Sequence, residues 1–116
     1  MTRILTPLTA ALVGLFVFTT SSSADVFELR TYTTNEGKLD NLNARFRDHT
    51  VGLFKKHGME SVGYWVPTDE KKSKNTLIYV ISHKNRDAAK TSWTAFLADP
   101  EWKKVAAESQ KDGQIL

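Results

Sequence analysis

The chain has 116 residues and no cysteine, so it is not a disulfide scaffold, and no cysteine nucleophile is available. Glycine and proline are scarce, with six and three residues, which excludes a collagen-like sequence. Positive charge is in small excess, since 16 Lys and Arg are interspersed with 13 Asp and Glu, which argues against a nucleic-acid-binding stripe. What is present, 41% hydrophobic residues and three Trp, suits one domain with an ordinary core.

The first 24 residues have the pattern of a secretory signal peptide. They carry one charged side chain, an apolar run over residues 10–18 and small residues up to Ala24. Ser22 and Ala24 suit a signal peptidase, which predicts cleavage before Asp25 and a secreted or periplasmic protein. The alternative is an uncleaved membrane anchor, although a membrane-spanning helix needs ~20 apolar residues. Cleavage leaves residues 25–116 as one domain without stable membrane insertion.

The remaining sequence predicts strands and helices in the order β-α-β-β-α-α. Period-two alternation marks the strands, and apolar residues spaced by three and four mark the helices. This order predicts an α+β, ferredoxin-like split β-α-β fold in which the fourth strand is short or missing. The expected elements are a strand at 25–34, a helix from 39 that ends before Gly58, strands at 60–66 and 76–83, a helix from 85 or 87 to 98, and a helix from 100 to about 112.

The third strand is apolar on both faces. Leu77, Tyr79 and Ile81 point to one side, and Ile78 and Val80 point to the other. Helices of such a domain cover one face of the sheet, so the second face needs another cover. Self-association is the simplest solution, and we expect a homodimer; the alternative is an apolar face in contact with solvent.

Several segments, in this order, resemble the NIPSNAP family. They include residues 27–32 (FELRTY), 45–50 (RFRDHT), 62–65 (VGYW) and 99–102 (DPEW), and the resemblance spans residues 26–116. It implies a dimeric α+β barrel, in which two sheets face each other across a shared interior. The resemblance does not imply a particular activity. Animal members of the family resemble proteins with interaction and trafficking roles. Relatives in the wider barrel superfamily include small cofactor-independent oxygenases and lyases.

Three polar side chains share one face of the first strand. Glu28, Arg30 and Tyr32 alternate with Phe27 and Leu29, so we expect them to point away from the helices into the barrel interior. A buried carboxylate and guanidinium must pair or bind something. Arg30 is a candidate to orient an anionic or carbonyl-bearing ligand, with Tyr32 as donor and Glu28 as base. The alternative is a structural ion pair across the dimer.

His49 falls on the apolar stripe of the first helix, so we expect it to face the sheet. It is either a core histidine or a residue that acts as a base or holds a ligand. Tyr64, Trp65 and Trp93 are candidates to line a small-molecule pocket, although Trp93 is most simply a core residue. The spacing of the histidines predicts no metal site, and we expect no cofactor.

Two functions remain open. The preferred one is a dimeric binding or interaction module without catalysis, because the sequence offers polar residues for binding but no complete set of acid, base and nucleophile. Its ligand would be a small hydrophobic or anionic molecule. The alternative is a small cofactor-independent enzyme acting on a hydrophobic or aromatic metabolite in the barrel cavity. A cavity reached by both Arg30 and His49 would favour the enzyme.

Overall fold

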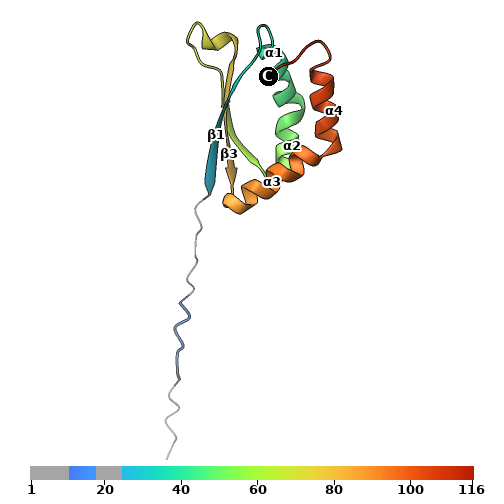
Figure 1. The fold of residues 1–116 in the computed structure, drawn as a ribbon. Coiled ribbons are helices and arrows are strands. Elements are labelled where there is room, and N and C mark those ends of the chain that lie inside the picture. Colours follow the sequence, from blue (N-terminus) through green and yellow to red (C-terminus); the bar gives the residue numbers. More distant parts are fainter. Residues whose placement is uncertain (1–10, 18–24) are drawn as a thin grey trace, which may run out of the picture.

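The computed structural model describes residues 11–17 and 25–116, and within these ranges the first helix or strand is β1 (Figure 1). The predicted signal peptide and its cleavage site lie largely outside the described residues, so both stay predictions. Within the described ranges, no helix is long and apolar enough to cross a membrane.

Strands and helices follow one another in the predicted order. The long first helix contains a π-helical turn, and the other elements begin and end close to the expected positions. Pro100 stands at the first position of the last helix, where the Asp99 carboxylate accepts from the Glu101 backbone N–H at 2.9 Å. The elements are β1 (Val26–Thr33), α1 (Leu39–Arg45), a π-turn (Phe46–Thr50), α2 (Val51–Lys56), β2 (Glu60–Trp65), a short 3-10 turn (Lys72–Lys74), β3 (Thr76–His83), α3 (Arg86–Ala98) and α4 (Pro100–Ser109).

The strands form an antiparallel sheet in the order β1-β3-β2, so β3 is the central strand of the described sheet. Tyr79 of β3 lies between Arg30 of β1 and Tyr64 of β2. A register shift between Ser61 and Gly63 interrupts the pairing of β2 with β3. Among the described residues, no fourth strand pairs with β1. The element order and the antiparallel sheet confirm the predicted α+β, ferredoxin-like fold.

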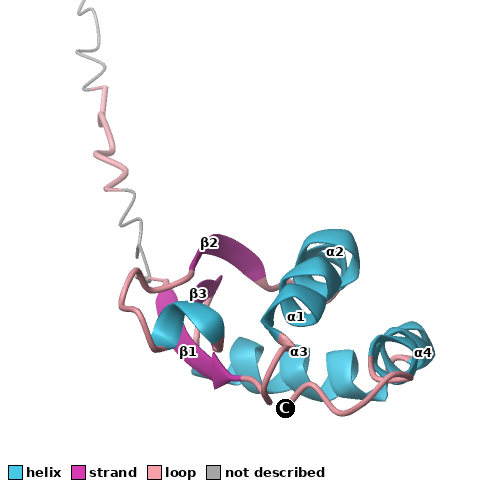
Figure 2. Cartoon of the chain, turned by 90° about the horizontal axis from the view of Figure 1, so that it is seen from above, coloured by secondary structure: helices cyan, strands magenta, loops and turns pink. Residues whose placement is uncertain are grey.

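The helices cover one side of the sheet, as Figure 1 shows along its edge and Figure 2 shows from above. The core lies between the two layers, where Tyr79 and Ile81 of β3 are fully buried. No element in the described part of the chain covers the other side. The buried apolar side chains are Leu39, Leu42, Phe46, Leu53, Phe54, Met59, Leu77, Tyr79, Ile81, Phe96, Val105 and Ile115.

The two faces of β1 are the reverse of those predicted. Glu28, Arg30 and Tyr32 lie on the side that the helices cover, whereas Phe27 and Leu29 are 64% and 68% exposed on the open side. The prediction was wrong because it placed the apolar residues under the helices. The polar side chains instead find partners there, from β3 and α3, which removes the penalty for burying them.

His49 is exposed, so the prediction that it faces the sheet is also wrong. The Val51 backbone N–H bonds to the Phe46 carbonyl five residues earlier, which defines a π-turn inside the helix. Such a turn holds one more residue than an α-helical turn. The side chains that follow therefore no longer lie on the apolar stripe that an uninterrupted α-helix would have. Thr50 takes the buried position, and its Oγ1 donates to the Arg45 carbonyl at 3.2 Å.

Candidate functional site

The Glu28 carboxylate is the centre of a polar cluster between β1, β3 and α3. Its Oε1 accepts from Trp93 Nε1 at 2.8 Å and faces His83 Nε2 at 2.9 Å, and its Oε2 accepts from Arg30 Nη1 at 2.7 Å. Burial alone would raise the pKa of Glu28, but the hydrogen bonds from Trp93, Arg30 and His83 outweigh it and lower the pKa. The carboxylate is therefore charged at neutral pH and already bonded within the chain.

Arg30 lies between two aromatic rings. Its guanidinium carbon is 4.6 Å from the Trp93 ring centroid and 5.6 Å from that of Tyr32. Burial acts to lower the pKa of Arg30, but the bond to Glu28 and the nearby tyrosines raise it above its ordinary value. Among the described residues its Nε has no hydrogen-bond partner. Arg30 is therefore chiefly the partner of Glu28, with one donor unused.

A pair of tyrosine hydroxyls continues the cluster inward. Tyr79 donates to the Tyr32 hydroxyl at 3.0 Å, and burial together with this bond raises the pKa of Tyr79, which stays neutral. Arg45 of α1 is also buried, and burial lowers its pKa. Arg45 donates to Ser109 Oγ at 3.3 Å and lies 5.1 Å from the Trp102 ring centroid. The interior thus holds a second guanidinium group, which bonds to a hydroxyl rather than to a carboxylate.

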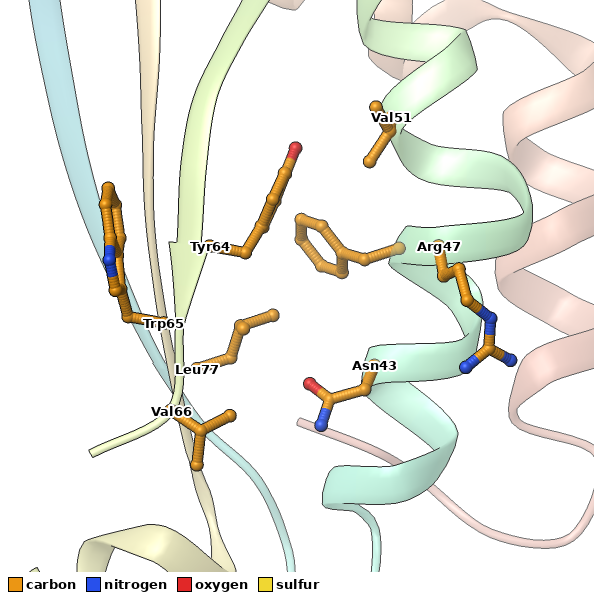
Figure 3. Close-up of a pocket in the computed structure, with 8 residues that line it drawn as sticks. Asn43, Arg47, Val51, Tyr64, Trp65, Val66 and Leu77 are labelled. Atoms are coloured by element: carbon orange, nitrogen blue, oxygen red, sulfur yellow. The ribbon is translucent and has the colours of Figure 1, made fainter. Parts of the chain in front are cut away.

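A cavity of about 390 Å³ lies at the other edge of the sheet, between β2 and the helical stretch α1–α2 (Figure 3). Tyr64 and Leu77 extend into it from the sheet, whereas the Trp65 indole extends to the other side of β2 (Figure 3). Burial raises the pKa of Tyr64, which stays neutral. The residues lining the cavity are Asn43, Phe46, Arg47, Val51, Tyr64, Trp65, Val66 and Leu77.

The predicted ligand-binding residues are therefore divided between separate places. Neither Arg30 nor His49 lines the cavity. Within the described residues, no three His, Cys, Asp or Glu side chains group closely enough to hold a metal ion. The polar cluster contains Glu28, Arg30, Tyr32 and Trp93, the cavity is bordered by Tyr64 and Trp65, and His49 lies apart from both on the outer side of the helix.

Sequence reasoning missed two residues that shape these sites. His83 is 3% exposed and belongs to the polar cluster; it alternates in phase with Tyr79 and Ile81, which was the available signal. Its carboxylate partner comes from β1, 55 positions away in sequence, so no local pattern could reveal the pair. Asn43 borders the cavity, and nothing in the sequence marks it among the polar residues of α1.

The β-α-β-β-α order of the elements and the antiparallel strand order β1-β3-β2 define the class of this domain as ferredoxin-like. The chain belongs to the NIPSNAP family, whose model matches residues 27–116. Among curated proteins, no sequence matches the chain significantly.

Solved structures of similar fold belong to the same family. An uncharacterized NIPSNAP-like domain protein from Burkholderia xenovorans superposes with a TM-score of 0.67 at 13% identity, covering 81% of this chain and 78% of that one. A NIPSNAP family protein of unknown function from Agrobacterium tumefaciens gives 0.64 at 22% identity and covers 78% of each chain. Likeness at these identities shows the fold.

Proposed function

We propose that the protein is a non-catalytic NIPSNAP module that forms a homodimer through the open face of its sheet and acts by binding a partner or ligand. The observation that carries this proposal is the apolar character of that face. Phe27 and Leu29 of β1 are 64% and 68% exposed, and Trp65 of β2 is 51% exposed. Large apolar side chains gathered on one exposed sheet face are typical of an interaction surface.

The register places these side chains next to one another. Leu29 pairs with Val80, and Trp65 pairs with Ile78. Gly63 also belongs to this face, and a Cβ there would lie 2.7 Å from the Trp65 ring, so the indole lies directly over the glycine. The result is a broad apolar surface rather than isolated side chains, which suits face-to-face packing of two sheets.

The same geometry supports binding rather than catalysis. The acidic and basic groups of the polar cluster bond to one another, and the cavity has Asn43 and Tyr64 as its neutral polar groups without a carboxylate or imidazole in its lining. A cavity reached by both Arg30 and His49 would favour the enzyme alternative, and neither residue lines this cavity.

Export is part of the proposal and rests on the leader pattern of residues 1–24. The exported form is expected to begin at Asp25. N-terminal sequencing of the protein recovered from the envelope or the medium tests this, and retention of Met1 would support a membrane anchor instead.

Sedimentation equilibrium at tens of micromolar tests the dimer. Leu29→Lys places a charge on the open face and is expected to yield a monomer, because a lysine buried without a partner opposes association. Leu97→Lys is the matched control, since Leu97 is 56% exposed on α3, away from the sheet face. A monomeric wild type, or a Leu29→Lys variant that still dimerises, would refute association through this face.

A further inference from the structure

The cavity beside β2 is lined by residues of a single subunit; it shares Trp65 with the proposed dimer face, whereas Phe27 and Leu29 do not line it. Its volume of about 390 Å³ falls in the ~300–1,000 Å³ range of small-molecule sites. Aromatic and aliphatic side chains form most of its wall: Phe46, Val51, Tyr64, Val66 and Leu77. We propose that it binds a small, uncharged aromatic molecule that carries a hydrogen-bond donor.

The aromatic wall is fixed in place by its own packing. Tyr64 stacks on Tyr79 at 5.7 Å between ring centroids, and Phe46 meets Tyr64 edge to face at 5.6 Å. The Tyr64 hydroxyl is bonded to Ser61 Oγ at 2.7 Å. Rings held in this way offer preformed edges and faces to an incoming ring, so binding requires little reordering.

The lining gives no partner to a charged ligand. Arg47 is the one charged residue of the lining, and its Nε and Nη2 donate to the Asp48 carboxylate at 2.9 and 3.3 Å. Its guanidinium extends away from β2 (Figure 3), and both side chains are exposed. A carboxylate or ammonium group entering the cavity would lose water without gaining a counter-charge, so the ligand is neutral.

Asn43 supplies the polar recognition. Its Oδ1 is buried and has no hydrogen-bond partner among the described residues, and its side chain extends from α1 toward β2 (Figure 3). A buried amide oxygen without a donor is unfavourable, so a rotation of the Asn43 amide that brings this oxygen to a ligand hydroxyl or N–H would remove that penalty. Because the Tyr64 hydroxyl is already bonded to Ser61, the unpartnered Asn43 oxygen favours molecules that combine a ring with a hydrogen-bond donor.

Isothermal titration with three naphthalene probes tests this inference. 2-Naphthol has a ring and a donor, 2-methoxynaphthalene lacks the donor, and 2-naphthoate is charged. The wild-type protein is expected to bind one 2-naphthol per chain about fivefold more tightly than 2-methoxynaphthalene, with no measurable binding of 2-naphthoate. Equal affinity for the two neutral probes, tighter binding of 2-naphthoate, or no binding of 2-naphthol would overturn the inference.

Variants locate the bound probe. Asn43→Leu should abolish the preference for 2-naphthol, whereas Asn41→Leu, the same change at an exposed position of α1, should preserve it. Val51→Phe should fill the cavity and abolish binding of both neutral probes; Val66→Phe replaces it if thermal melts show that Val51→Phe is unfolded. Unchanged binding in the cavity-filling variant would overturn the location. Leu29→Lys should bind 2-naphthol normally, so failure of the dimer and failure of this site are distinguishable.

Discussion

Replacing Glu28 by Ala tests whether the polar cluster holds β1 to α3. The substitution removes the acceptor for Trp93 Nε1 and the partner of His83, which is 3% exposed. An unsatisfied buried polar group costs about 1–3 kcal/mol, whereas Arg30, 36% exposed at its side chain, regains water. We expect Glu28→Ala to lower the free energy of unfolding by about 3 kcal/mol and the Tm by roughly 15 °C.

Denaturant titration followed by circular dichroism measures the loss. Glu60→Ala is the control, since Glu60 is an exposed carboxylate on β2, and it should change the free energy of unfolding by less than ~0.5 kcal/mol. A double-mutant cycle with Trp93→Phe, which keeps a ring but removes the N–H, should show non-additivity of about 1 kcal/mol. Additive effects, or a Glu28→Ala variant as stable as the control, would refute the assigned hydrogen bonds.

Three further outcomes are expected. Because hydrogen bonds from Lys56 and His57 lower the pKa of Asp99, and the pKa of Glu28 is also lowered, their stabilisation is complete above ordinary carboxyl pKa values near ~4. It is lost progressively as the pH falls below ~4 toward the lower folded-state pKa values. Thermal melts from pH 7 to pH 3 should show the onset of this loss, with a weaker slope for Glu28→Gln. His49→Ala should alter the free energy of unfolding by less than ~0.5 kcal/mol and Thr50→Val should lower it by about 1 kcal/mol, as measured by urea titration; the reverse ranking would contradict the π-turn. Gly52→Ala should raise stability by roughly 0.5–1 kcal/mol in the same titration, because an added Cβ meets no atom within 4 Å; destabilisation would contradict this.

The sequence was sufficient for the element order, because local patterns decide it. The third strand lies at Thr76–His83 as predicted, and Pro100 begins α4 as its fixed φ favours. The alternation of residues in β1 also predicted correctly which side chains share a face of the strand. It could not decide which group faces the helices, because both β1 groups mix apolar and polar character and the deciding partners, Trp93 and His83, are distant in sequence.

The helix shows a different limit. A stripe drawn with 3.6 residues per turn assumes an uninterrupted α-helix, and it placed His49 beside the sheet. The π-turn interrupts the α-helix from Phe46 onward, so the assumption fails there. The turn contains no glycine or proline from which the interruption could be predicted. The cavity lies against this same stretch, because Phe46 begins the turn, Val51 follows it, and both residues line the cavity. The feature that sequence reasoning missed is therefore one that shapes a candidate binding site.

The two sides of β2 contribute to different proposed sites, the dimer face and the small-molecule cavity. Tyr64 faces the cavity, and its neighbour Trp65 lies over Gly63 on the open face, so consecutive residues of one edge strand serve different surfaces. The charges of Glu28 and Arg30 are paired on the covered side of β1, whereas Phe27 and Leu29 and two neutral threonines lie on its open side. Packing of two sheets through this open face would therefore bury no charged group at the centre of the interface. A neutral ligand would likewise bring no charged group into the cavity.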